Sequence, residues 1–228
     1  MSGRIGVYLE IAGKRTFACA IAWPGWSRSG KTPDLALEAL LASAPRYARV
    51  VRASGLGGFG APGAVSDLEV VERLEGGSGT DFGVPSATPG ADRERLSDVE
   101  LARQAVLLEA SWSAFDTGAT AARGVELRKG PRGGGRDLDK IVEHVLEAER
   151  AYLTQLGSRA PMPDETGTAA QMTQIREWAL DALARRARDE PLAEPNRVKR
   201  PWLPRYFVRR SAWHALDHAW EIEDRAVP

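Results

Sequence analysis

The chain has 228 residues, 43% of them hydrophobic, which is enough to bury one large core or two small ones. Its 31 basic residues equal its 31 acidic residues in number, so no global positive field draws it to nucleic acid or to an anionic membrane. The single cysteine, Cys19, excludes an internal disulfide. No apolar run spans a bilayer or has the layout of a signal peptide, so we expect a cytoplasmic protein without nucleic-acid or membrane partners.

A β-hairpin is the first element expected. Apolar and polar residues alternate over 4–22 around a turn at Gly13-Lys14, as they do in two paired strands. The pair Thr32-Pro33 is typical of a helix N-terminus, and Pro45 should end or kink the helix that follows. The segment 67–74 can return as a further strand. We therefore expect a small α+β unit at the N-terminus.

Three motifs in this region resemble a known module. They are Trp23-Pro24-Gly25-Trp26, Ser29-Gly30-Lys31-Thr32 and Leu35-Ala36-Leu37-Glu38-Ala39, and they follow the predicted strands. Together they make residues 4–54 similar to the small ββαβ-type module of HicB-like proteins. Such modules are regulatory partners in toxin–antitoxin systems, and the resemblance implies a role of that kind.

A change of composition then suggests a domain boundary. Residues 76–90 are rich in Gly, Ser, Thr and Pro and show little hydrophobic periodicity, which is typical of a linker. We therefore expect a HicB-like α+β domain at 1–75, a linker at 76–92 and a second domain at 93–228.

Four amphipathic helices are expected in the second domain. The first opens with the capping box Ser97-Asp98-Val99-Glu100, and the glycine-rich stretch 118–135 should end it. The second is capped by Asp137, and the third opens with a further capping box, Thr168-Ala169-Ala170-Gln171. The fourth covers 209–225, after a proline-rich connection. Four such helices predict an all-α four-helix bundle, so the whole chain is expected to be α+β.

The chain has only three histidines, and their positions indicate a metal site. His214 and His218 are four residues apart, so they lie on one face of the last helix and can share an ion. His144 falls at the edge of the inner face of the second predicted helix, where it can supply a third ligand. Three imidazoles leave a position open for water or substrate, as in catalytic sites. The alternative is a pair of core histidines with hydrogen-bond partners and an unrelated surface histidine.

The segments around these histidines resemble a known superfamily. Glu143-His144-Val145-Leu146-Glu147-Ala148-Glu149 and Trp213-His214-Ala215-Leu216-Asp217-His218, on the second and fourth of four helices, are similar to the DinB-like (YfiT-like) metalloproteins. The resemblance covers residues 95–228. It implies that the three histidines bind a divalent metal, zinc or nickel, and that the protein is a thiol-dependent S-transferase or isomerase using mycothiol, bacillithiol or glutathione.

Two further residues are candidates for the catalytic site. Glu221 follows the last histidine by three residues, so it can be a fourth ligand, a hydrogen-bond acceptor for an imidazole, or a general base. Its alternative role is an i,i+4 ion pair with Arg225. Tyr152 lies two turns from the first histidine and can donate a hydrogen bond to a substrate oxygen, or it can simply pack.

Two arginines before the second helix are candidates for cofactor binding. Arg132 and Arg136 stand beside a helix N-terminus, where guanidinium groups and backbone amides can hold the anionic part of a substrate or of a thiol cofactor. The alternative is a solvated loop.

Two functions are open on this basis. One is a metal-dependent transferase, isomerase or hydrolase acting on a small molecule. The other is a non-catalytic HicB-like binding or regulatory module whose metal-stabilised bundle forms a homodimer. The histidine spacing favours the enzyme, although spacing alone identifies no nucleophile and no acid–base pair.

Overall fold

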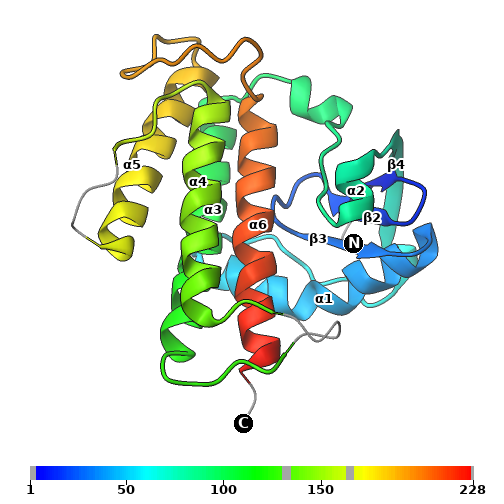
Figure 1. Cartoon of the computed structure of the whole chain (residues 1–228). Coiled ribbons are helices and arrows are strands. Elements are labelled where there is room, and N and C mark those ends of the chain that lie inside the picture. The colour runs from blue at the N-terminus through cyan, green and yellow to red at the C-terminus, as the bar shows by residue number, and fades with distance from the viewer. Residues whose placement is uncertain (1–3, 130–134, 163–166, 227–228) are drawn as a thin grey trace.

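The computed structural model describes residues 4–129, 135–162 and 167–226. The protein is α+β: a four-stranded mixed sheet and helix α1 lie on one side, and four long helices lie on the other (Figure 1). In this described part of the chain, no helix is both long and apolar enough to cross a bilayer.

The sheet has the strand order β3-β2-β1-β4. Its strands are β1 (Ile5–Ile11), β2 (Thr16–Ala20), β3 (Ser27–Gly30) and β4 (Leu68–Glu75). β1 and β2 are antiparallel, which confirms the predicted hairpin, and the Ala12 amide donates to the Arg15 carbonyl across the turn at 2.9 Å. The chain re-enters the sheet through a short 3-10 turn, η1 (Val65–Asp67), and β4 then pairs parallel with β1.

Helix α1 (Pro33–Ala53) packs against β2 and β3. Thr32 caps it as predicted, because its side chain accepts a hydrogen bond from the Leu35 amide. Of the two outcomes predicted for Pro45, an end or a kink, the end does not occur, since the helix continues for two more turns. Pro45 is exposed, so water can reach the carbonyl that it leaves unpaired, while the buried face holds the helix on the sheet. That face includes Ala36, Leu37, Leu40, Ala44, Tyr47, Val50 and Val51.

The segment expected to be a linker is fastened to the sheet. It contains helix α2 (Ser78–Phe82) and a 3-10 turn, η2 (Gly90–Arg93). Glu10 of β1 is fully buried beneath it, and its carboxylate accepts hydrogen bonds from the Thr80 hydroxyl and from the amides of Ser86 and Ala87. A buried carboxylate needs such donors, so these contacts tie the segment to β1.

The four long helices lie side by side (Figure 1). They are α3 (Asp98–Ala121), α4 (Leu138–Leu156), α5 (Thr168–Ala187) and α6 (Pro204–Arg225). Helix α6 contacts both α3 and α4, and α4 also contacts α5. Helix α6 therefore stands at the centre of the molecule, with long helices on one side and the sheet on the other.

Two of the three caps predicted for the long helices are present. The Ser97 capping box opens α3, and the Asp137 side chain accepts from the Lys140 amide at the start of α4. The capping box predicted at Thr168 was wrong. Gly167 occupies the cap position with φ of +87°, and Thr168 already lies in the first turn of α5, where its side chain cannot cap.

One further helix limit is confirmed and one differs. Helix α3 ends at Ala121, inside the glycine-rich stretch 118–135 that was predicted to end it. Gly118 faces α6, where an added Cβ would make an ordinary van der Waals contact of 3.6 Å with the Ala219 carbonyl oxygen. Helix α6 begins at Pro204, five residues earlier than predicted, because a proline fits the first turn of a helix.

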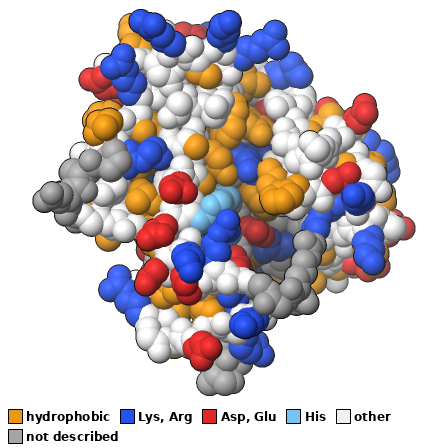
Figure 2. Space-filling view, viewed as in Figure 1, with side chains coloured by type: hydrophobic (Ala, Val, Ile, Leu, Met, Phe, Trp, Pro, Cys, Tyr) orange, Lys and Arg blue, Asp and Glu red, His pale blue; other side chains and the backbone are white. Residues whose placement is uncertain are grey.

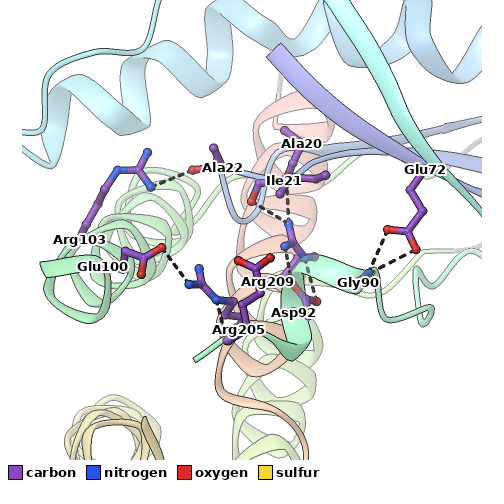
Figure 3. Close-up of polar contacts among 11 residues, drawn as sticks. Ala20, Ile21, Ala22, Glu72, Gly90, Asp92, Glu100, Arg103, Arg205 and Arg209 are labelled. Carbon is purple, nitrogen blue, oxygen red and sulfur yellow. Dashed lines mark hydrogen bonds and ion pairs between the residues drawn. The ribbon is translucent and has the colours of Figure 1, made fainter. Parts of the chain in front are cut away.

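Polar contacts join the sheet side to the helices (Figure 3). Arg209 of α6 is buried, and its Nη2 donates to the buried Asp92 carboxylate at 2.6 Å, while its Nη1 donates to the Ala20 carbonyl at the end of β2 at 2.7 Å. Arg103 of α3 donates to the Ala22 carbonyl at 2.8 Å. Because these donors and acceptors come from both sides, the contacts fix how the sheet meets α6.

The apolar core is continuous across residues 76–92. Val7 and Leu9 of the sheet and Leu40 of α1 belong to the same buried cluster as Leu108 of α3 and Phe207 of α6. The sheet and the long helices therefore share one core.

Candidate metal centre

Helices α4 and α6 bring the three histidines together. The imidazole of His144 points from α4 toward those of His214 and His218 on α6, and one ring nitrogen from each lies in a group whose atoms are all within 4.8 Å of one another. The ring centroids are 5.1 Å apart for His144 and His214, and 4.6 Å apart for His214 and His218. No other group of three His, Cys, Asp or Glu side chains in the described part of the chain converges in this way.

The spacing of two of these nitrogens suits a shared ion. The Nε2 atoms of His144 and His214 are 3.3 Å apart. Two nitrogens bound to one tetrahedral zinc at about 2.0–2.1 Å each lie about 3.3–3.4 Å from one another. These two side chains therefore already stand at the separation that two ligands of one ion require.

The surroundings keep two of the rings neutral. Burial lowers the pKa of His214 well below its usual value, and the charges of His218 and Arg210 act in the same direction. Burial and the charge of Arg136 lower the pKa of His144. Only a neutral imidazole has a lone pair to give, so both rings are in the form that binds a metal.

Glu221 makes both contacts that its sequence position allows. Its Oε2 lies 2.9 Å from Nδ1 of His218, and its Oε1 lies 2.6 Å from Nη1 of Arg225. The hydrogen bond from His218 is the main reason that the pKa of Glu221 is lowered, so the carboxylate is ionised and acts as the acceptor. Nδ1 of His218 then carries the proton, and its Nε2 is left with a lone pair directed away from Glu221.

Tyr152 of α4 forms part of the wall beside the histidines. Its ring centroid is 5.5 Å from that of His214 and 5.2 Å from that of Trp202. Burial raises the pKa of Tyr152, although the charge of Arg210 opposes this effect. Its hydroxyl therefore stays protonated at neutral pH and can donate a hydrogen bond.

The two arginines predicted before α4 as cofactor-binding residues have different outcomes. Arg132 lies outside the described residues. Arg136 precedes the first turn of α4, and its carbonyl accepts a hydrogen bond from Nη2 of Arg225 at 2.8 Å. Its positive charge helps to lower the pKa values of His144 and His214, and its side chain is exposed.

The histidines reach the surface. Figure 2 shows histidine side chains in a shallow hollow, with hydrophobic side chains on one side and charged side chains below. His144 is partly exposed, whereas His214 and His218 are buried behind it. A small molecule can therefore approach the cluster from solvent. A separate cavity of about 660 Å³ lies between α3, α4 and α5, and none of the histidines lines it.

Arg210 and its aromatic neighbours belong to the site but are not evident from the sequence. Arg210 precedes His214 by one helical turn, and its guanidinium lies 4.7 Å from the ring centroid of Trp213. Tyr206 joins this wall through Trp202, with ring centroids 4.9 Å apart. The i,i+4 spacing of an arginine and a histidine was the available signal.

Cys19 has no role in the site. It is fully buried in β2, where burial raises the pKa of its thiol to about 12. The thiol is therefore not ionised at neutral pH.

Comparison with known proteins adds no assignment. No protein-family model, no curated protein and no solved structure matches this chain. The function must be argued from the geometry of the site.

Proposed function

We propose that the protein is a metal-dependent enzyme acting on a small molecule, with His144, His214 and His218 as ligands of one zinc or nickel ion. The observation that carries the proposal is the convergence of three imidazoles from two helices, two of them at ligand spacing. In this proposal α3 to α6 are a DinB-like four-helix bundle, and residues 1–75 are a HicB-like domain attached to it.

The set of donors supports a divalent ion of this type. Imidazole nitrogens suit zinc and nickel, and three protein ligands leave a position free for substrate, as in catalytic zinc sites. A carboxylate that accepts from the distal nitrogen of a ligand histidine is the usual companion of such a site, and Glu221 fulfils that role toward His218.

The protein side chains have distinct tasks in the proposed chemistry. A divalent ion supplies a Lewis acid that lowers the pKa of a bound thiol or water. Glu221 holds the tautomer of His218, and the Tyr152 hydroxyl can donate to a substrate oxygen beside His214. The aromatic side chains near Tyr152 keep bulk water from that side of the substrate.

We further propose that a low-molecular-weight thiol, such as mycothiol, is the co-substrate of an S-transfer or isomerisation reaction. An open three-histidine site suits the formation of a thiolate at neutral pH. The positive charge of Arg136 acts on His144 and His214, and its exposed guanidinium can hold an anionic part of the thiol.

The experiment that tests this function begins with metal analysis. We expect close to one divalent ion per chain, and we expect His144→Ala, His214→Ala and His218→Ala each to remove it. Glu143→Ala is the matched control, because Glu143 precedes His144 on α4 and is exposed. Circular dichroism reports whether each variant still folds. Full metal content in all three histidine variants would show that these histidines are not the metal ligands.

The second step replaces the metal with cobalt and adds mycothiol, bacillithiol or glutathione. Binding of the thiol sulfur should produce a sulfur-to-cobalt absorption band. If none of the three thiols changes the spectrum at millimolar concentration while a hydroxamate does, a metal-dependent hydrolase or lyase replaces the thiol enzyme. If metal is bound but no small ligand reaches it, the non-catalytic binding module becomes the better interpretation.

A further inference from the structure

One nitrogen of Arg210 is buried and lacks a hydrogen-bond partner. This atom is Nη1, and no acceptor within the described residues reaches it. The contrast with the preceding residue is direct, because both Nη atoms of Arg209 are bound by Asp92 and by carbonyls at the end of β2. Nor does any carboxylate in the described ranges form an ion pair with Arg210. A buried cationic donor without an acceptor is costly, which makes Arg210 a place where a ligand gains free energy.

Arg210 lies beside the candidate metal centre. It precedes His214 by four residues, so the two side chains leave the same face of α6. The Arg210 guanidinium is 5.3 Å from the ring centroid of Tyr152, and that ring is 5.5 Å from the ring of His214. The positive charge of Arg210 also helps to lower the pKa of His214.

The aromatic contacts of Arg210 leave its Nη1 available, although the guanidinium also forms a hydrogen bond with the Tyr152 side chain. The guanidinium stands over the rings of Trp213 and Tyr152, at 4.7 Å and 5.3 Å from their centroids. Contacts of this kind hold a guanidinium in place without using its donors. Two parallel N–H groups of an arginine fit the two oxygens of a carboxylate.

A second buried donor lies beside it. Nε1 of Trp213 also has no hydrogen-bond partner in the described part of the chain. A cavity of about 10 Å³, lined in part by Arg209, Arg210 and Trp213, has room for no more than a single water molecule. One water there could accept a hydrogen bond, but it would bring no negative charge. That cavity is too small for a carboxylate, so an anionic acceptor has to reach Arg210 from the side of Tyr152 and His214.

We infer that Arg210 binds the carboxylate of the substrate while the other end of the same molecule reaches the metal. The inference rests on the proposed function and names its substrate class: a small organic acid that carries a metal-binding group at one end and a carboxylate at the other. The rings of Tyr152, Trp202 and Tyr206 cover the apolar middle of such a molecule.

The test compares ligands that differ in one carboxylate. Cobalt-substituted protein is titrated with acetohydroxamate, which binds a metal but has no carboxylate, and with the monohydroxamates of succinate and glutarate, which add one. In the wild-type protein we expect at least one of the two acids to bind about tenfold or more tightly than acetohydroxamate. Arg210→Gln should abolish this preference, so that the two acids bind no more tightly than acetohydroxamate.

The control replaces another arginine that stands over a tryptophan. Arg103 lies on helix α3, away from the histidines, and its guanidinium is 4.4 Å from the ring centroid of Trp23. Arg103→Gln should keep the full preference for the acid. Arg210→Lys keeps the charge but not the paired donors, so it should keep part of the preference, and it covers the case in which Arg210→Gln does not fold.

The outcomes separate the inference from the function on which it rests. Failure of the wild-type protein to bind cobalt would contradict the proposed function. Binding of cobalt and acetohydroxamate without a preference for either acid would contradict the inference alone. A preference that persists in Arg210→Gln would also contradict the inference alone, because the carboxylate would then not be bound by Arg210.

Discussion

The hydrogen bond between His218 and Glu221 determines which nitrogen of that histidine faces the cluster. With Nδ1 bound to the carboxylate at 2.9 Å, only Nε2 is free to act as a ligand. The neighbouring contact from Arg225 holds the other carboxylate oxygen at 2.6 Å, so the carboxylate cannot turn away easily. The tautomer of His218 is therefore set before a metal binds.

This arrangement gives a prediction for Glu221. We expect Glu221→Ala to lower the metal affinity about 10- to 100-fold, because His218 loses both its orientation and the nearby negative charge. Glu221→Gln keeps an acceptor for Nδ1, so its loss should be smaller. Competition with a chelator of known affinity measures both variants.

The control is Glu147→Ala, on an exposed position of α4 one turn after His144. It removes a carboxylate near the site without removing a hydrogen bond to a histidine, so its effect should be small. Equal affinities for wild type and Glu221→Ala would show that the His218 tautomer does not depend on Glu221.

At this scale the sequence predicts side-chain chemistry only where spacing within one helix determines it. His214, His218 and Glu221 share a face of α6 because they are three or four residues apart, and that follows from helix geometry alone. The unpartnered nitrogen of Arg210 depends on which carboxylates the fold brings close. Local spacing places Arg210 one turn before His214, but it carries no information about the missing partner of that nitrogen.

At the scale of elements, the turn between β2 and β3 packs directly against α6. Gly25 in this turn has a φ of +90°, and a Cβ placed there would lie 3.0 Å from the side chains of both Ala212 and Leu216. The glycine thus serves two purposes: it adopts a left-handed backbone conformation, and it leaves room for the helix that carries two of the histidines.

Gly25→Ala should therefore destabilise the protein through strain and overpacking together, by about 2–4 kcal/mol in the free energy of unfolding. Gly58→Ala is the matched control, because Gly58 has a φ of +88° but no atom within 4 Å of the added Cβ. It should show the backbone strain alone, about 1 kcal/mol. Urea unfolding measures both, and equal effects would mean that the turn does not press on α6.

The elements themselves were largely predictable, and the errors have physical causes. The hairpin and the caps at Thr32, Ser97 and Asp137 depend on local side-chain chemistry that the sequence displays. Pro45 does not end its helix because packing on the sheet outweighs one lost hydrogen bond. Thr168 does not cap because α5 begins one residue earlier, after Gly167.

At the scale of the whole molecule, the connection between the sheet and the helices is a structural element and not a spacer. Its composition, rich in glycine and proline, led to the expectation of a linker at 76–92. Composition shows that a segment lacks long helices or strands, but not whether it is bound to its neighbours. The buried carboxylate of Glu10 and the buried pair of Asp92 with Arg209 supply that binding.

The shared core leads to a prediction for a fragment that contains only the long helices. Residues 93–228 retain all three histidines but lose the sheet and α1, which cover apolar side chains of α6 such as Phe207 and Val208. They also lose Asp92, so Arg209 keeps neither its carboxylate nor the carbonyls of β2. Breaking one buried ion pair by removing a partner costs about 3–5 kcal/mol, a large part of the stability of an ordinary domain.

We therefore expect the fragment 93–228 to have low helicity or to aggregate, and to bind metal more weakly than the full chain. Co-expression with residues 1–92 should restore a one-to-one complex that binds metal, because the two pieces regain the common core and the contact between Asp92 and Arg209. Circular dichroism, size-exclusion chromatography and metal analysis of each sample provide the measurement. A monomeric, helical fragment 93–228 with the metal affinity of the full chain would show that the helices form an independent domain, as composition alone suggests.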